Sequence, residues 1–114
     1  SFRQVTVANS GLTDGNGWIP VNFDAIVGGS PISNIPVDPV NTITAPAAVV
    51  YADLVYRYGC AVGPRSFEID ARLESDAYTV TDNKMAHDGG NTPLLYEVGT
   101  NLIILGKDAG VTEF

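Results

Sequence analysis

The stretch NTITAPAAVVYADLVYRYGC, residues 41–60, holds the longest apolar run of the chain. Its valines and tyrosines favour extended backbone, so the run predicts a strand over Ala47–Cys60. Successive side chains of a strand point to opposite faces. One face would carry Ala48, Val50, Ala52, Leu54, Tyr56 and Tyr58, and the other Val49, Tyr51, Asp53, Val55 and Arg57. Both faces are largely apolar, although a strand in a small domain usually leaves one face to water.

Two interpretations account for the second face of this strand. The proline-rich segment 28–46, an extended connection, could cover it within the same chain. Alternatively, the face is a subunit interface, where tyrosine and arginine are favoured and Asp53 could pair with Arg57 of another copy. The interface residues would then be Val49, Tyr51, Asp53, Val55 and Arg57. We expect either a chain that covers its own strand or one that assembles.

The rest of the chain predicts an all-β fold, an antiparallel β-sandwich of about seven to nine strands without substantial helix. Twelve glycines and seven prolines divide the sequence into short pieces. The clearest alternation lies in Ser66–Glu74 and predicts an apolar core face and an acidic face in water. The core face is Phe67, Ile69, Ala71 and Leu73, and the wet face is Glu68, Asp70, Arg72 and Glu74. Further strands are expected at Phe2–Ala8, Trp18–Phe23, Tyr78–Thr81, Leu94–Val98 and Asn101–Leu105, with a turn at Asp14–Gly17.

Length and composition limit the classes of protein. The chain has 114 residues, which suits a single domain. We expect residues 1–10 to form an N-terminal strand or docking arm and residues 11–114 a single β-sandwich. The net charge of −7 argues against nucleic acid or an anionic membrane as the partner. No apolar run approaches the roughly 20 residues of a membrane span, and Ser1–Ser10 does not resemble a signal peptide, so we expect synthesis in the cytoplasm.

No set of residues predicts catalysis. The single histidine, His87, has no nucleophile in a recognisable local motif, and the single cysteine, Cys60, is predicted to be a small core residue. A calcium hypothesis rests on the Asp- and Asn-rich loop that includes Asp82 and Asp88, although turns use the same residue types. We therefore expect no enzyme activity, no required cofactor and no established metal site.

Three segments resemble the C1q/TNF-like jelly-roll family. FDA at 23–25 precedes ITAPAAVVYADLVY at 43–56, and LLYEVGTNLIIL at 94–105 is similar to a later strand of that family. The matching signature positions are Ile43, Thr44, Ala45, Pro46 and Tyr51. Members of the family are jelly rolls that form homotrimers around an apolar axis, and some are bacteriophage virion proteins. The resemblance implies a jelly-roll homotrimer with Tyr51, Val49 and Val55 near the threefold axis.

These observations lead to two functional hypotheses. The first is a structural virion protein, a homotrimeric capsid decoration protein of a tailed bacteriophage that stabilises the shell. It would bind the major capsid protein through Phe2, Arg3 and Val5 in the N-terminal arm. The second is a fibre-tip or lectin-like module that binds a carbohydrate or receptor, with Trp18 stacking on sugar rings. The first places the protein in the virion after synthesis in the host cytoplasm.

Overall fold

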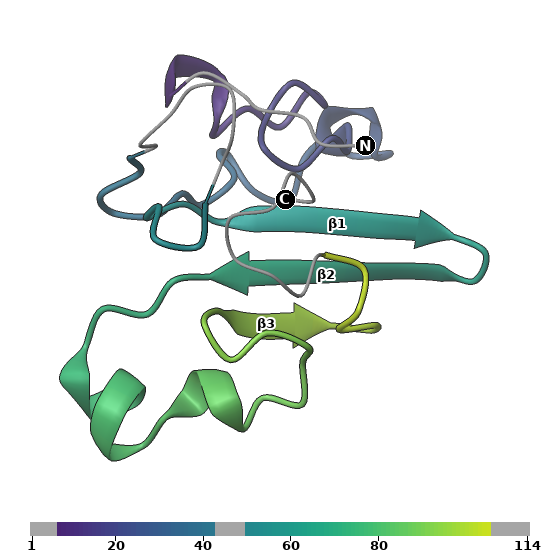
Figure 1. Ribbon diagram of the computed structural model, residues 1–114. Helices are drawn as coiled ribbons and strands as arrows, with labels where there is room; N and C mark the ends of the chain where they lie inside the picture. Colours follow the sequence, from purple (N-terminus) through teal and green to yellow (C-terminus); the bar gives the residue numbers. More distant parts are fainter. Residues whose placement is uncertain (1–6, 43–49, 106–114) are drawn as a thin grey trace.

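The regular structure of this chain is mainly β. A computed structural model describes residues 7–42 and 50–105. Three strands, β1 (Arg57–Val62), β2 (Arg65–Ala71) and β3 (Tyr96–Gly99), form one antiparallel sheet in the order β1-β2-β3 (Figure 1). The helical segments of the described residues are single turns: η1 (Val7–Asn9), η2 (Phe23–Ala25), η3 (Ala77–Thr81) and η4 (Lys84–Ala86). An antiparallel β fold with little helix is therefore confirmed.

The sheet lies between two irregular regions. The N-terminal third runs alongside β1, whereas the segment from the end of β2 to β3, with η3 and η4, lies on the β3 side (Figure 1). Trp18 holds the first region in place, because its indole Nε1 donates to the Pro36 carbonyl at 2.8 Å. The same ring packs edge-on against Tyr56 with the ring centroids 5.9 Å apart. No helix in the described part of the chain has the length and apolar character needed to cross a membrane.

The strand expected over Ala47–Cys60 is shorter than predicted and begins only at Arg57. The reason is a local turn, in which the Asp53 amide donates to the Val50 carbonyl at 3.0 Å. The Asp53 carboxylate also accepts the Val50 amide at 2.8 Å. A side chain that bonds to nearby backbone in this way competes with strand pairing. The break predicted at Gly63-Pro64 is confirmed, because the β1–β2 hairpin turns there.

Two other predicted strands are wrong. Trp18–Phe23 forms no strand in the structure, and its Asn22 makes an isolated bridge with Asp14. Asn22 then caps η2 by accepting the Ala25 amide. Tyr78–Thr81 belongs to the helical turn η3. Propensity alone had favoured strands in both places, and local capping and turn bonds override it.

The remaining predictions have mixed outcomes. The turn at Asp14–Gly17 is present, with Gly15 at a φ of 92°. Segment 28–42 forms no strand beyond an isolated bridge of Thr42 with Leu54. The strand expected at Leu94–Val98 is β3, shifted to Tyr96–Gly99. The strand predicted at Asn101–Leu105 is wrong: the segment is irregular and instead donates its backbone amides at Ile104 and Leu105 to Glu68. Of the strand predicted at Phe2–Ala8, residues 1–6 lie outside the described residues.

The face assignment of β2 is reversed. The predicted alternation is present, but Glu68 and Asp70 are fully buried, whereas Phe67 is 39% exposed. Cys60, predicted as a core residue, is also exposed. The reversal has a physical cause: backbone amides from neighbouring segments cover the acidic face and hydrogen-bond two of its carboxylates. The apolar face of the sheet has no such cover among the described residues.

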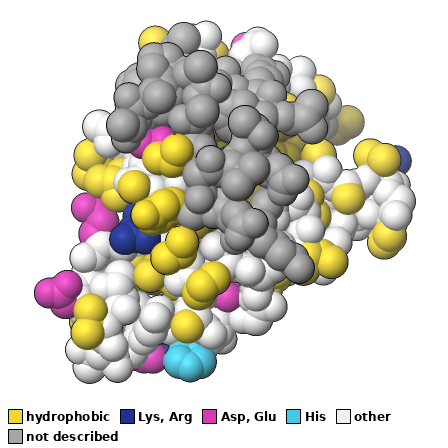
Figure 2. All heavy atoms as spheres, in the orientation of Figure 1, with side chains coloured by type: hydrophobic (Ala, Val, Ile, Leu, Met, Phe, Trp, Pro, Cys, Tyr) yellow, Lys and Arg dark blue, Asp and Glu magenta, His cyan; other side chains and the backbone are white. Residues whose placement is uncertain are grey.

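The apolar core is small. Leu95 and Leu105 form its centre, with Tyr51 packed against them. Among the described residues five large hydrophobic side chains are buried, while fifteen are exposed. Figure 2 shows hydrophobic side chains distributed over much of the surface that it draws. Within residues 7–42 and 50–105, large hydrophobic side chains are therefore exposed more often than they are buried.

Candidate functional site

The covered face of the sheet carries two rows of directly opposed residues. Arg57 of β1 pairs with Asp70 of β2, which pairs with Glu97 of β3. In the next row Gly59, Glu68 and Gly99 are opposed in the same order. Opposed residues of antiparallel strands point to the same face, as do residues two apart on one strand. The sheet thus places three carboxylates together on its buried side.

Glu68 is held by the segment that follows β3. Its Oε2 accepts the backbone amides of Ile104 and Leu105, both at 2.7 Å. Gly59 makes this approach possible, because a Cβ there would lie 2.8 Å from Leu105 Cδ2. A Cβ at Gly99 would instead overlap the backbone of β2. Gly59 therefore provides the space in which the covering segment lies, and Gly99 allows the close approach of β3 to β2.

Glu97 is held by the loop before β3. Its Oε1 accepts the Asn91 amide at 3.2 Å, and its Oε2 accepts the Thr92 amide at 3.0 Å. The Glu97 amide in turn donates to Asp88 Oδ2 at 2.8 Å. Gly90 lies so close to the Glu97 carboxylate that a Cβ there would overlap it. The loop backbone thus fixes the orientation of this carboxylate.

Asp70 lies between these two acids and has a different environment. It is fully buried, and neither of its carboxylate oxygens has a hydrogen-bond partner. Glu68 Oε1 is also buried without a partner. One carboxylate oxygen from each of Glu68, Asp70 and Glu97 lies within 4.8 Å of the others. Three ionised carboxylates buried this close together would repel one another at a high cost in free energy. The cluster therefore requires bound protons or a cation.

The electrostatics of the cluster favour bound protons when no cation is present. Burial, and next the carboxylates of Glu68 and Glu97, raise the pKa of Asp70 to about 8 despite the opposing effect of Arg57. Burial is also the largest cause that raises the pKa of Glu97 to about 7. A protonated Asp70 could donate to Glu68 and relieve the repulsion between the two groups. The cluster can therefore exchange protons near neutral pH.

Arg57 supplies the positive charge beside the cluster. Its guanidinium donates to the carbonyls of Val55 at 3.1 Å, Val50 at 2.6 Å and Asp53 at 3.2 Å. Burial lowers the pKa of Arg57, while the nearby Asp70 and Asp53 oppose that shift. An arginine remains charged under these conditions. Arg57 thus ties the 50–55 turn to the sheet and partly balances the acids.

The residues predicted at a subunit interface differ in how far their own chain buries them. Asp53, Val55 and Arg57 are buried within one copy of the chain. Tyr51 is half-buried, with the Arg72 guanidinium 5.6 Å from its ring centroid. Val49 lies outside the described residues, as do the predicted docking residues Phe2, Arg3 and Val5. The interface and docking assignments stay predictions.

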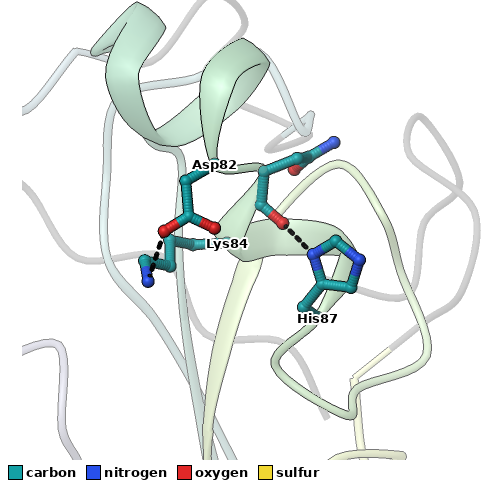
Figure 3. A network of polar contacts seen from close by, with 4 residues as sticks. Asp82, Lys84 and His87 are labelled. Carbon is teal, nitrogen blue, oxygen red and sulfur yellow. Dashed lines mark hydrogen bonds and ion pairs between the residues drawn. The ribbon is translucent and has the colours of Figure 1, made fainter.

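The loop that includes His87 and the two weak calcium candidates forms local contacts (Figure 3). Asp82 pairs with Lys84 at 2.6 Å, and His87 Nδ1 lies 2.9 Å from the Asn83 carbonyl. Asp88 accepts the Gly90 amide at 2.8 Å in addition to that of Glu97. Within residues 7–42 and 50–105, the acids that meet in a group of three are Glu68, Asp70 and Glu97, and neither calcium candidate belongs to it.

Sequence reasoning missed the three acids of this cluster. Glu68 and Asp70 alternate with apolar residues, which is the usual pattern of a strand face in water. The information that distinguishes the two cases is the pairing of β2 with β3, which brings Glu97 opposite Asp70. The glycines at 59, 90 and 99 are the only local signal, because they mark close approach of backbone.

Comparison with known proteins adds no relative: no protein-family model, curated protein or solved structure matches this chain.

Proposed function

We propose that this protein is a structural assembly protein that functions as a homotrimer, most concretely a capsid decoration protein that stabilises the shell of a tailed bacteriophage. The proposal includes the jelly-roll sandwich of about seven to nine strands expected from the sequence, of which the described residues supply one three-stranded antiparallel sheet. The observation that carries it is the apolar outer face of that sheet, on which Phe67, Tyr96 and Val98 remain partly exposed in one copy.

The outer face is built from the residues that alternate with the buried acids. Tyr58, Ile69 and Val98 are opposed across the three strands, as are Ala71 and Tyr96 on β2 and β3. Val98 is 42% exposed and Val62, at the tip of the hairpin, is 91% exposed. Contiguous apolar surface of this kind marks an interaction site. A second copy of the chain presents the same apolar surface, and closed cyclic symmetry would bury it without leaving free ends.

This location differs from the interface predicted on the Tyr51 face. Three of the five residues assigned there are already buried against their own chain, which leaves them little surface for a partner to cover. The outer sheet face retains such surface. The two locations predict opposite effects of single substitutions on assembly, and this allows a direct test.

The test is the molar mass of the purified chain by light scattering at several concentrations. We expect a trimer for the wild type and a monomer for Val98→Lys, because a lysine would have to be buried at the interface. Tyr51→Ala should remain a trimer. The control is Val80→Lys on η3, a side chain that is 75% exposed outside the sheet. A wild-type monomer at every concentration would contradict self-association, and a trimeric Val98→Lys would contradict the location.

The virion assignment needs a separate experiment. Capsid shells stripped of decoration protein should bind the chain on mixing, and removal of residues 1–10 should abolish binding without changing the trimer. Failure to cosediment with any shell offered would count against the capsid role and leave the assembly result standing. The fibre-tip or lectin-like alternative gains no support from the described contacts, because the Trp18 ring is half-buried and packs against Tyr56.

A further inference from the structure

We propose that Glu68, Asp70 and Glu97 form a calcium-binding site, closed over by the loop before β3 and the segment after it. This inference goes beyond the assembly function and does not depend on it. It also differs from the weak hypothesis for Asp82 and Asp88, since it uses acids on the buried face of the sheet.

The spacing of the carboxylates fits one ion. Calcium binds oxygen at about 2.3–2.6 Å, so two ligands on opposite sides of the ion lie about 5 Å apart. One oxygen from each of the three acids lies within 4.8 Å of the other two. The three side chains can therefore reach one ion without rearrangement of the sheet.

The cluster also has open oxygen positions for a cation. Glu68 Oε1 and both oxygens of Asp70 are buried without partners. Each Glu97 oxygen accepts one hydrogen bond, which leaves it a second lone pair. Asn91, whose amide donates to Glu97, has a buried Oδ1 that also lacks a partner. The three acids thus offer five open oxygens, and the remaining ligand of the six to eight that calcium takes would come from Asn91 Oδ1 or from water.

The charge of the site matches a dication. Three ionised carboxylates beside the Arg57 guanidinium carry a net charge of about −2, which one Ca²⁺ would neutralise. Like charges directly opposed across strands, as Asp70 and Glu97 are, otherwise destabilise a sheet. A bound cation converts this repulsion into ligation.

The backbone already orients two of the ligands. The amides of Ile104 and Leu105 hold Glu68, and those of Asn91 and Thr92 hold Glu97. Outer hydrogen bonds of this kind orient ligands in established metal sites. The all-oxygen donor set excludes a preference for zinc, which selects nitrogen and sulfur. Magnesium usually retains several waters, and side chains that are at most 2% exposed leave them little access.

The experiment is calorimetric titration of CaCl₂ into the full chain after dialysis against a chelator. We expect one calcium per chain and an affinity at least about tenfold weaker in Asp70→Asn. Asp82→Asn is the matched control, since it makes the same change of charge in an exposed side chain, and its affinity should stay within about twofold. Titration with MgCl₂ should give a much weaker signal.

A second variant tests the geometry without changing the charge. Gly90→Ala places a methyl group against the Glu97 carboxylate and should weaken calcium binding as strongly as Asp70→Asn. Thermal unfolding of the wild type in calcium and in chelator does not depend on how any variant folds, and calcium should raise the midpoint. An unchanged midpoint at millimolar calcium, undiminished binding by Asp70→Asn, or equal binding of magnesium would each overturn the calcium site. The molar mass of the trimer is a separate readout, so the two proposals can fail independently.

Discussion

At the scale of a single residue, the position of Asp70 opposes its ionisation, because strand register places its carboxylate where a charge is costly. Its place in β2, opposite Arg57 and Glu97, is fixed by strand register. Its carboxylate is fully buried beside two other acids and has no hydrogen-bond donor. A neutral Asp70 is the stable form in the folded protein when no cation is present, and the unfolded chain prefers the ionised form above pH 4.

The stability of the calcium-free protein should therefore decrease as the pH rises. The pKa of Asp70 is raised from 3.8 to about 8 on folding, so its contribution is fully present below pH 4 and is lost as the pH rises through 8. Glu97, raised to about 7, changes in the same direction. Urea unfolding in chelator should give a lower free energy of unfolding at pH 8 than at pH 5. Asp70→Asn should reduce this difference, and an unchanged pH dependence would contradict the raised pKa.

At the scale of an element, β1 connects the sheet to the segments that lie over its buried face. Arg57 binds the 50–55 turn, and Gly59 provides the space for the segment that holds Glu68. Each position is suited to a residue of one particular size. Loss of either should affect the neighbouring segment more than the β1–β2 hairpin itself.

Arg57→Met should lower the free energy of unfolding by about 2–4 kcal/mol. The methionine fills similar volume but leaves the carbonyls of Val50, Asp53 and Val55 without their donor. Urea unfolding measures the change. Arg65→Met, an exposed arginine at the other end of the hairpin, is the control and should change stability by less than about 0.5 kcal/mol. Equal effects of the two variants would show that the buried contacts of Arg57 contribute little.

Gly59→Ala should destabilise the protein by about 1–3 kcal/mol, because its Cβ would approach Leu105 Cδ2 to 2.8 Å. The displaced segment should lose protection, so hydrogen exchange at the Ile104 and Leu105 amides should accelerate. Gly63→Ala is the control, since a Cβ at Gly63 meets no atom within 4 Å. Unchanged exchange at both amides in Gly59→Ala would mean that the segment does not depend on this space.

At the scale of the whole molecule, the sequence predicted the class of secondary structure better than the burial of its side chains. The β class, the Gly63-Pro64 turn and the alternation in β2 follow from propensity and period. Which face of β2 is buried does not follow from them, because it depends on amides supplied by residues 91–92 and 104–105. The carboxylate cluster was invisible for the same reason: its members meet only through the register of β2 and β3.

The single cysteine offers a readout of assembly. Cys60 is exposed and lies on the outer side of β1, directly opposite Phe67. If this face is the trimer interface, maleimide labelling of Cys60 should slow as protein concentration rises. In Val98→Lys the labelling rate should be independent of concentration. A wild-type rate that stays constant while light scattering shows a trimer would place the interface elsewhere.

The close fit of Gly90 against the Glu97 carboxylate has a consequence for evolution. A lineage that acquires a side chain at position 90 must shorten or lose the acid at 97, and the same trade joins position 59 to Leu105. Related sequences, when they are aligned, should therefore show coordinated variation: a glycine at 90 wherever 97 is glutamate, a glycine at 59 wherever 105 is bulky, and release of each constraint where its partner has been replaced.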